Sequence, residues 1–276
     1  MTLFKIVLIT GGTGSLGQQL ARMFLKHGYK VRIFSRNENL QHEMKEKFNN
    51  SMLKFFLGDV RDKPRLYRAM ENVDIVIHAA ALKHVDAGEY NPFEFINTNV
   101  LGSQNVIDCC IEREVRHCIA ISSDKAVNPS GVYGATKLLM EKIFLAADNI
   151  RGSHKTKFAC IRLGNLFNSN GSVVQKFKTQ NKLQVTDLNA TRFTMTVEKA
   201  CLDIVKILEV EKTGLIIPKL RAYILRDLVE AFDKPYDITG LRPGEKLHEE
   251  MEENVNSNTT PKLTKEELVE LIECLR

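Results

Sequence analysis

The chain has 276 residues, of which 43% are apolar and 26% charged, and its formal net charge is +5. A chain of this length can bury one large core, or one core with a smaller lobe. The basic residues form no concentrated run, which gives no support to a nucleic-acid groove, and no apolar run approaches the length of a membrane span.

Six cysteines stand at positions 109, 110, 118, 160, 201 and 274. Their spacing matches no metal-ligand pattern, and no signal peptide indicates an oxidising compartment. We therefore predict reduced, buried thiols, no metal site and a cytoplasmic protein.

The first predicted strand, Leu3 to Ile9, leads directly into a glycine-rich turn and a helix. Glycines in this turn permit a tight bend, close approach of a pyrophosphate to the backbone and close packing of the helix. The helix N-terminus adds amide donors for the phosphates. A turn of this kind between the first strand and the first helix predicts a dinucleotide site. Its predicted residues are Gly11, Thr13, Gly14, Ser15, Leu16 and Gly17.

The second predicted strand, Val31 to Phe34, ends in Ser35 and Arg36. An acidic residue here would bind the ribose hydroxyls of NAD, whereas an arginine suits a 2′-phosphate. The sequence therefore favours NADP, with NAD as the alternative.

The third predicted strand, Phe55 to Leu57, precedes Asp59 and Val60, which we expect at the adenine. Asp59 could instead only cap the following helix.

The fourth predicted strand, Val73 to Ile77, is followed by small residues that let a cofactor lie close to the backbone. These are Ala79, Ala80 and Ala81. Lys83 could reach a phosphate or a sugar, or could simply be a solvated surface residue. His78 and His84 lack metal-ligand companions and are predicted to be structural.

The fifth predicted strand, Val115 to Ile121, places Asp124 and Lys125 at its carboxyl end, where open α/β sheets bind ligands. Tyr133 and Lys137 follow one helical turn apart and therefore share a helix face. A lysine beside a phenol lowers the phenol's pKa, which equips a tyrosine for proton transfer. A Tyr-x-x-x-Lys pair alone is weak evidence, but here it follows a predicted cofactor site. The alternative for Asp124 and Lys125 is a surface ion pair.

Alternating strands and helices continue through a predicted helix, Asn97 to Arg113, and a sixth strand, Phe158 to Leu163. The pattern predicts an α/β fold: a Rossmann-type doubly wound parallel sheet with a smaller C-terminal substrate lobe. We expect an NADP-binding core over residues 1–163. Residues 164–276 are expected to form mainly the substrate lobe, with segments returning to the core.

Beyond Leu163 the predicted elements become short and the loops polar. They are helices at Val197 to Val210, at Tyr223 to Phe232 and from Thr264, and a strand at Leu215 to Ile217.

Motifs along nearly the whole chain carry a resemblance to a known family. They are Thr10 to Gly17, His78 to Val85, Asn91 to Glu94, Asn97 to Val100, Ser123 to Ala126, Tyr133 to Leu138, Arg162 with Gly164 and Asn165, Thr191 to Phe193, and Arg242 to His248. With them the chain resembles the extended short-chain dehydrogenase/reductases, and more narrowly the soluble UDP-N-acetylglucosamine 4,6-dehydratases. The region after Arg192 looks shortened relative to that family.

The resemblance implies an NADP-dependent lyase and, as partners, a UDP-sugar and further copies of the chain. Tyr133, activated by Lys137, would take the proton of the carbon 4 hydroxyl. Lys125 would be the base at carbon 5, and a protonated Asp124 the acid at carbon 6. Tyr133 stands where membrane-attached relatives carry methionine, which resembles the forms that invert carbon 5.

The resemblance also implies substrate contacts, by Lys83, Asn165, Val174, Thr186, Arg192, Arg242 and Glu245. Either arginine could instead be solvated or structural, and Glu245 could pair with a neighbouring lysine. Two other functions stay open. One is a UDP-hexose 4-epimerase on the same fold, and the other is a non-catalytic NADP-sensing protein.

Overall fold

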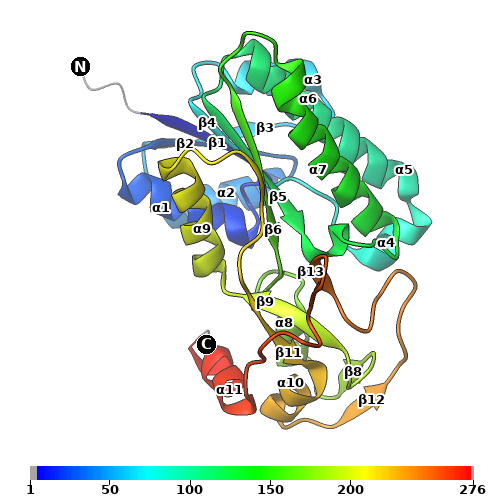
Figure 1. Ribbon diagram of the computed structural model, residues 1–276. Helices are drawn as coiled ribbons and strands as arrows, with labels where there is room; N and C mark the ends of the chain where they lie inside the picture. The colour runs from blue at the N-terminus through cyan, green and yellow to red at the C-terminus, as the bar shows by residue number, and fades with distance from the viewer. Residues whose placement is uncertain (1–4, 275–276) are drawn as a thin grey trace.

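The computed structural model describes residues 5–274, and its centre is a seven-stranded parallel sheet in the order β10-β6-β5-β4-β1-β2-β3. Helices cover both faces of this sheet, and a smaller lobe lies beyond the carboxyl ends of its strands (Figure 1). The predicted doubly wound parallel sheet is confirmed. The strands are β1 (Ile6–Thr10), β2 (Lys30–Ser35), β3 (Leu53–Leu57), β4 (Ile75–His78), β5 (His117–Ser123), β6 (Lys157–Leu163) and β10 (Gly214–Ile216).

Two apolar cores lie on the two faces of the sheet, because side chains of successive strand residues point to opposite sides. Val7 and Ile9 of β1 belong to one core, and Leu8 between them belongs to the other. The helices of the first core are α1 (Ser15–Lys26), α2 (Glu38–Phe48) and α9 (Val197–Glu209). Those of the second are α3 (Lys63–Ala69), α6 (Gly102–Glu112) and α7 (Val132–Ile150), with the short α4 (Val85–Tyr90) and α5 (Pro92–Phe95) beside them.

The strand order reverses between β1 and β4, which both pair with their neighbours in parallel. At such a reversal the loops that follow the two strands run to opposite faces and leave a crevice for a ligand. The glycine-rich turn after β1 and the three alanines after β4 therefore meet at one edge of the sheet.

The C-terminal lobe has an apolar core of its own, to which Phe167, Phe177, Tyr223 and Leu228 contribute. In chain order its elements are β7 (Asn165–Leu166), α8 (Val173–Thr179), β8 (Leu183–Val185), β9 (Thr191–Met195), β11 (Arg221–Ile224), α10 (Leu225–Phe232), β12 (Tyr236–Ile238), β13 (Glu250–Glu252), β14 (Val255–Asn256) and α11 (Lys265–Glu273). Between β9 and β11 the chain returns to the first domain as α9 and β10.

The predicted helix from Asn97 to Arg113 is confirmed, but its first part is not α-helical. Residues Ile96–Leu101 form a π-helix, and α6 begins only at Gly102. The Asn99 side chain accepts a hydrogen bond from the Leu82 amide (2.8 Å) and donates one to the Leu82 carbonyl (2.9 Å). Wide π-turns are frequent at functional sites, and this one fixes the loop after β4.

The predicted helix from Tyr223 to Phe232 begins too early. Tyr223 lies in β11, where it pairs with Arg192 of antiparallel β9, and α10 starts at Leu225. Sheet pairing overrides the helical pattern here because Tyr223, only 1% exposed, packs into the core of the lobe. The beginning of the first predicted strand, Leu3, lies outside the described residues.

His78 is structural, as predicted. It is buried between the Thr10 and Ser103 hydroxyls, 2.8 and 2.9 Å away, and burial lowers its pKa to about 3. All six thiols are free and five are buried, but Cys274 is exposed, so the prediction of burial is wrong there. Among residues 5–274, we find no helix with the length and apolar character needed to cross a membrane.

Candidate active site

A cavity of about 1080 Å³ opens at the carboxyl edge of the sheet and extends into the lobe. The structure brings to its wall all the residues predicted for the cofactor and the substrate. Of the four predicted catalytic residues, Lys125, Tyr133 and Lys137 line it as well, but Asp124 does not. Asp124 is fully buried behind the wall, in the short 3₁₀ helix η2 (Asp124–Ala126).

The glycine-rich turn has the shape that a pyrophosphate cradle needs. Gly11 has a φ of +65°, and a Cβ there would lie 2.8 Å from the backbone of Ala79 and Ala80. A Cβ on Gly17 would lie 2.5 Å from Gly12 Cα. Gly14, which precedes α1, would contact only the Gly11 carbonyl, at 3.4 Å, so its other side is open. The first amides of α1 are free of helical partners and suited to phosphate oxygens.

The end of the cavity at which the sequence predicts the adenosine carries an exposed arginine, Arg36. The Arg36 guanidinium is 52% exposed and lies 3.7 Å from the Asp59 carboxylate. The Ser35 hydroxyl accepts a hydrogen bond from Gln41. Burial raises the pKa of Asp59, but hydrogen bonds and charge from Arg61, with Arg36, hold that pKa below its usual value. Asp59 does not cap α3, since Asp62 does so. Arg36 is therefore a half-exposed cation in the cavity wall, beside the Asp59 carboxylate.

The loop after β7 closes over the glycine-rich turn. Lys83 donates to the Asn170 carbonyl (2.7 Å), and the Asn170 amide donates to the Ser15 hydroxyl (2.9 Å). Burial lowers the pKa of Lys83. Lys83 is therefore an exposed residue of the cavity wall whose amine is held by the loop. His84 lies on the cavity rim, and the buried Val174 adds an apolar wall.

Lys125 reaches the cavity from the end of β5 and is held between two carboxylates. Its Nζ lies 3.1 Å from Asp124 Oδ1, 3.2 Å from Glu249 Oε1 and 3.3 Å from Asn165 Oδ1. Burial alone would lower the pKa of Lys125, but the charges of Asp124 and Glu249 outweigh it and raise that pKa above its usual value. The Asp124–Lys125 ion pair, which was the alternative weighed from the sequence, is thus present, but it lies in the cavity wall with Asp124 fully buried and Lys125 half-buried, and the amine carries its proton.

The expected effect of Lys137 on Tyr133 is wrong. Burial raises the pKa of the Tyr133 phenol, and the charge of Lys125 with a hydrogen bond to Ser123 offsets this only in part. Lys137 instead donates to the Ile121 carbonyl (2.6 Å), and burial lowers its pKa to about 8. The lysine whose charge lowers the pKa of the Tyr133 phenol is therefore Lys125, at the end of β5, and not Lys137.

Ser123 is a site residue that the sequence patterns did not single out. It lines the cavity, hydrogen-bonds to Tyr133, and its Oγ donates to Asp124 Oδ1 at 2.8 Å. Ser123 therefore connects the buried Asp124 to the cavity. Its place directly before the Asp-Lys pair was the available signal.

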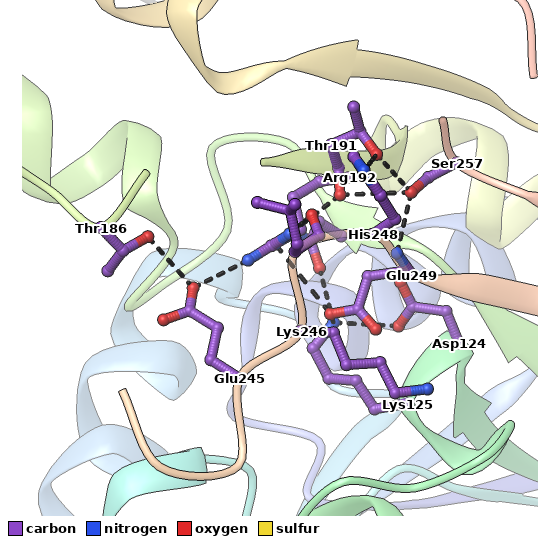
Figure 2. A network of polar contacts seen from close by, with 12 residues as sticks. Asp124, Lys125, Thr186, Thr191, Arg192, Glu245, Lys246, His248, Glu249 and Ser257 are labelled. Carbon is purple, nitrogen blue, oxygen red and sulfur yellow. Dashed lines mark hydrogen bonds and ion pairs between the residues drawn. The ribbon is translucent and has the colours of Figure 1, made fainter. Parts of the chain in front are cut away.

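The other end of the cavity, called the sugar end because the sequence predicts the substrate there, is a network of paired charges (Figure 2). Glu245 accepts from Arg192 Nη2 (2.8 Å) and from Arg242 Nε (3.3 Å), and the Thr186 hydroxyl is 3.4 Å away. Burial raises the pKa of Glu245, but the two arginines together bring that pKa below its usual value. Glu245 therefore pairs with arginines rather than a lysine. Arg192, only 7% exposed, also donates to the carbonyls of Thr191 and Leu247.

Glu249 continues this network toward Lys125 and is the second site residue that sequence reasoning missed. Its Oε1 lies 4.0 Å from Arg192 Nε as well as 3.2 Å from Lys125 Nζ. Figure 2 shows the line of contacts from Thr186 through Glu245 and Arg192 to this carboxylate. No spacing rule relates Glu249 to Lys125, because only the fold brings them together.

Comparison with known proteins places this site in a family. The model for a family described as polysaccharide biosynthesis protein matches residues 7–270. The chain belongs to this family. It is 45% identical over 266 residues to the UDP-N-acetylglucosamine 4,6-dehydratase (inverting) of Campylobacter jejuni strain 81-176, a match that covers 93% of the chain and 80% of that relative. The resemblance carried by the motifs is confirmed.

The chain is also similar to a protein named as an epimerase and to a solved structure. The UDP-glucose 4-epimerase of Rickettsia conorii is 38% identical, over 90% of this chain and 77% of its own length. The X-ray structure of Pen from Bacillus thuringiensis superposes with a TM-score of 0.95 at 35% identity, covering 100% of this chain and 99% of Pen. The chain is therefore similar both to a protein named as a 4,6-dehydratase and to one named as a 4-epimerase, the two reactions weighed from the sequence.

Proposed function

We propose that the protein catalyses the NADP-dependent 4,6-dehydration of UDP-N-acetylglucosamine to a UDP-4-keto-6-deoxy sugar, with inversion at carbon 5. The observation that carries this proposal is the Lys125 amine, which reaches the cavity close enough for its charge to act on Tyr133. A 4-epimerase has no use for a base at carbon 5, whereas elimination of water requires one. The 45% identity to an inverting dehydratase supports the same choice.

When bound, NADP would accept hydride from carbon 4 and return it to carbon 6. The glycine-rich turn and the first amides of α1 would hold its pyrophosphate, and Arg36 its 2′-phosphate. Arg242, whose side chain is 54% exposed and donates to Glu245 through Nε, would meet the diphosphate of the substrate, while Arg192 holds the loop in place.

Dehydration transfers the proton of the carbon 4 hydroxyl to the departing carbon 6 hydroxyl, and the site offers a path for it. Tyr133 accepts that proton as its own passes to Ser123, and the Ser123 proton passes to Asp124. The protonated Asp124 later gives a proton back through Ser123 to the carbon 6 hydroxyl, which leaves as water. A carboxylate behind the cavity wall can therefore serve as the acid.

Lys125 acts at carbon 5, which lies between carbon 4 and carbon 6. Oxidation at carbon 4 makes the carbon 5 hydrogen acidic, and the neutral amine of Lys125 removes it. Carbon 5 is then protonated again after hydride has returned to carbon 6.

The test is incubation with UDP-N-acetylglucosamine in D₂O, followed by product mass and by deuterium at carbon 5. We expect loss of one water and deuterium incorporation. Lys125→Ala should abolish water loss and leave NADP binding near normal. Lys157→Ala, at the far end of β6, is the control. Turnover by the Lys125 variant would show that another group is the base.

The 4-epimerase remains the second candidate because of the rickettsial relative. An epimerase would return a UDP-sugar of unchanged mass and would tolerate loss of Lys125. A protein that binds NADP and leaves every UDP-sugar intact would instead be a cofactor sensor.

A further inference from the structure

Glu249 is a buried carboxylate whose contacts demand an explanation. Its side chain is 3% exposed and lies 3.2 Å from the Lys125 amine, and its Oε2 has no hydrogen-bond partner among the described residues. Leaving a buried carboxylate oxygen unpaired is costly. An unpaired carboxylate oxygen beside the Lys125 amine can accept a proton.

The backbone holds Glu249 firmly in this position. Its amide donates to the buried Ser257 hydroxyl at 2.8 Å, and the Ser257 amide donates back to the Glu249 carbonyl at 2.8 Å. Two residues further on, the Met251 carbonyl accepts from Arg162 of β6 at 2.7 Å. The carboxylate is therefore presented by the fold and does not arrive by chance from a mobile loop.

We propose that Glu249 takes up the proton of Lys125 and thereby turns its amine into the base that acts at carbon 5. This inference rests on the dehydration proposed above. Glu249 acts through Lys125 and not on the sugar, so it is a positioning residue. Asp124 also has a buried oxygen without a partner among the described residues, Oδ2. It is still the less suitable acceptor, because its Oδ1 accepts from Ser123 and the carboxylate must hold a proton for the carbon 6 hydroxyl.

The protons balance over the cycle. Before reaction Lys125 is an ammonium, and Asp124 and Glu249 are carboxylates. Oxidation at carbon 4 protonates Asp124 and removes one of the two charges that hold the lysine proton. That proton then passes to Glu249, and the neutral amine takes the hydrogen of carbon 5 as a proton. When carbon 5 is protonated again, the pair gives one proton back and returns to ammonium and carboxylate.

The bound sugar favours this transfer. The sugar would cover the cavity side of Lys125 and displace water there, which disfavours the charged forms of both groups. A neutral amine beside a neutral carboxylic acid loses little solvation free energy. The titratable and charged groups that face Lys125 from the surrounding elements are Asp124, Tyr133, Arg192, Tyr223 and Glu249. Of these, Asp124 and Glu249 make the direct contacts with the amine.

The test compares Glu249→Gln with wild type in single-turnover experiments across pH, following the absorbance of reduced cofactor and the loss of water. We expect carbon 4 oxidation to proceed, reduced cofactor to accumulate, and water loss at pH 7 to fall by roughly a hundredfold or more. The remaining water loss should rise with pH, because the amine must then give its proton to solvent. In wild type it should stay flat over the same range.

Glu250→Gln is the matched control, since Glu250 accepts from Asn128 instead of facing Lys125. Wild-type water loss with a flat pH profile in Glu249→Gln would overturn the inference and leave the dehydratase standing. A wild-type product of unchanged mass would overturn the proposed function itself. If Glu249→Gln melts early, Glu249→Asp decides: a flat profile supports proton uptake by the carboxylate, and a rising one contradicts it.

Discussion

The two ends of the cavity are built by different means. At the cofactor end the wall is backbone and small side chains, with Gly11 close to Ala80 and Gly17 close to Gly12. At the sugar end it is charged side chains that pair with one another, above all Arg192 and Glu245. A glycine cradle holds its shape through steric exclusion, whereas a charge network holds its shape only while every member is present. The two ends should therefore fail in different ways.

The largest effect is expected at the sugar end. Arg192→Met leaves Glu245 and Glu249 buried without their shared cation, and removal of one member of a buried pair costs about 3–5 kcal/mol. Urea unfolding should show this as a lower midpoint. Arg221→Met breaks the exposed pair with Glu267 and should change stability little. Equal losses in the two variants would mean that the network does not hold the lobe together.

The cofactor end should respond to a single methyl group. Gly11→Ala forces alanine into a φ of +65° with its Cβ 2.8 Å from the backbone after β4, at a cost of roughly 2–4 kcal/mol. Gly14→Ala meets only ordinary contacts in the protein, so its stability should stay the same. Its methyl group points into the open side of the turn and should weaken dinucleotide binding.

Unfolding curves and cofactor titration of both glycine variants distinguish the two roles. A Gly14 variant that unfolds as early as the Gly11 variant would show that the turn is tight throughout, and not open toward the phosphates.

The same difference decides what could be predicted from the sequence. The cofactor end follows from local order: a strand, a turn with glycines at set positions and a helix, and the structure keeps Gly11 to Gly17 in that arrangement. The seven-stranded sheet follows from the alternation of apolar strands and helices. Both rest on neighbours in the chain, which is why periodicity and spacing suffice.

The sugar end could be predicted only as a set of residue types. Lys125 could be placed at a strand end, but its partner Glu249 lies more than a hundred residues further along the chain. The charge state of the amine could therefore not be predicted from residues that are near it in the sequence. The Tyr133 pKa was misjudged for the same reason: spacing pointed to Lys137, and the fold directs that amine to the Ile121 carbonyl. The role of Ser123 could not be predicted from the sequence, because it depends on Asp124 being turned away from the cavity.

Arg36 gives the smallest and sharpest test, because it is a charged residue at the end built mainly from backbone. Its guanidinium is half-exposed and only loosely paired with Asp59, so it is available to a 2′-phosphate. A hydrogen bond to a charged group is worth about 1.5–3 kcal/mol, so Arg36→Ala should weaken NADP binding by roughly tenfold to a hundredfold. NAD, which lacks that phosphate, should bind as before. Arg61→Ala removes the arginine on the other side of Asp59 and should leave the ratio of the two affinities unchanged. Equal weakening of NADP and NAD by Arg36→Ala would mean that this arginine supports the adenosine pocket as a whole and does not read the phosphate.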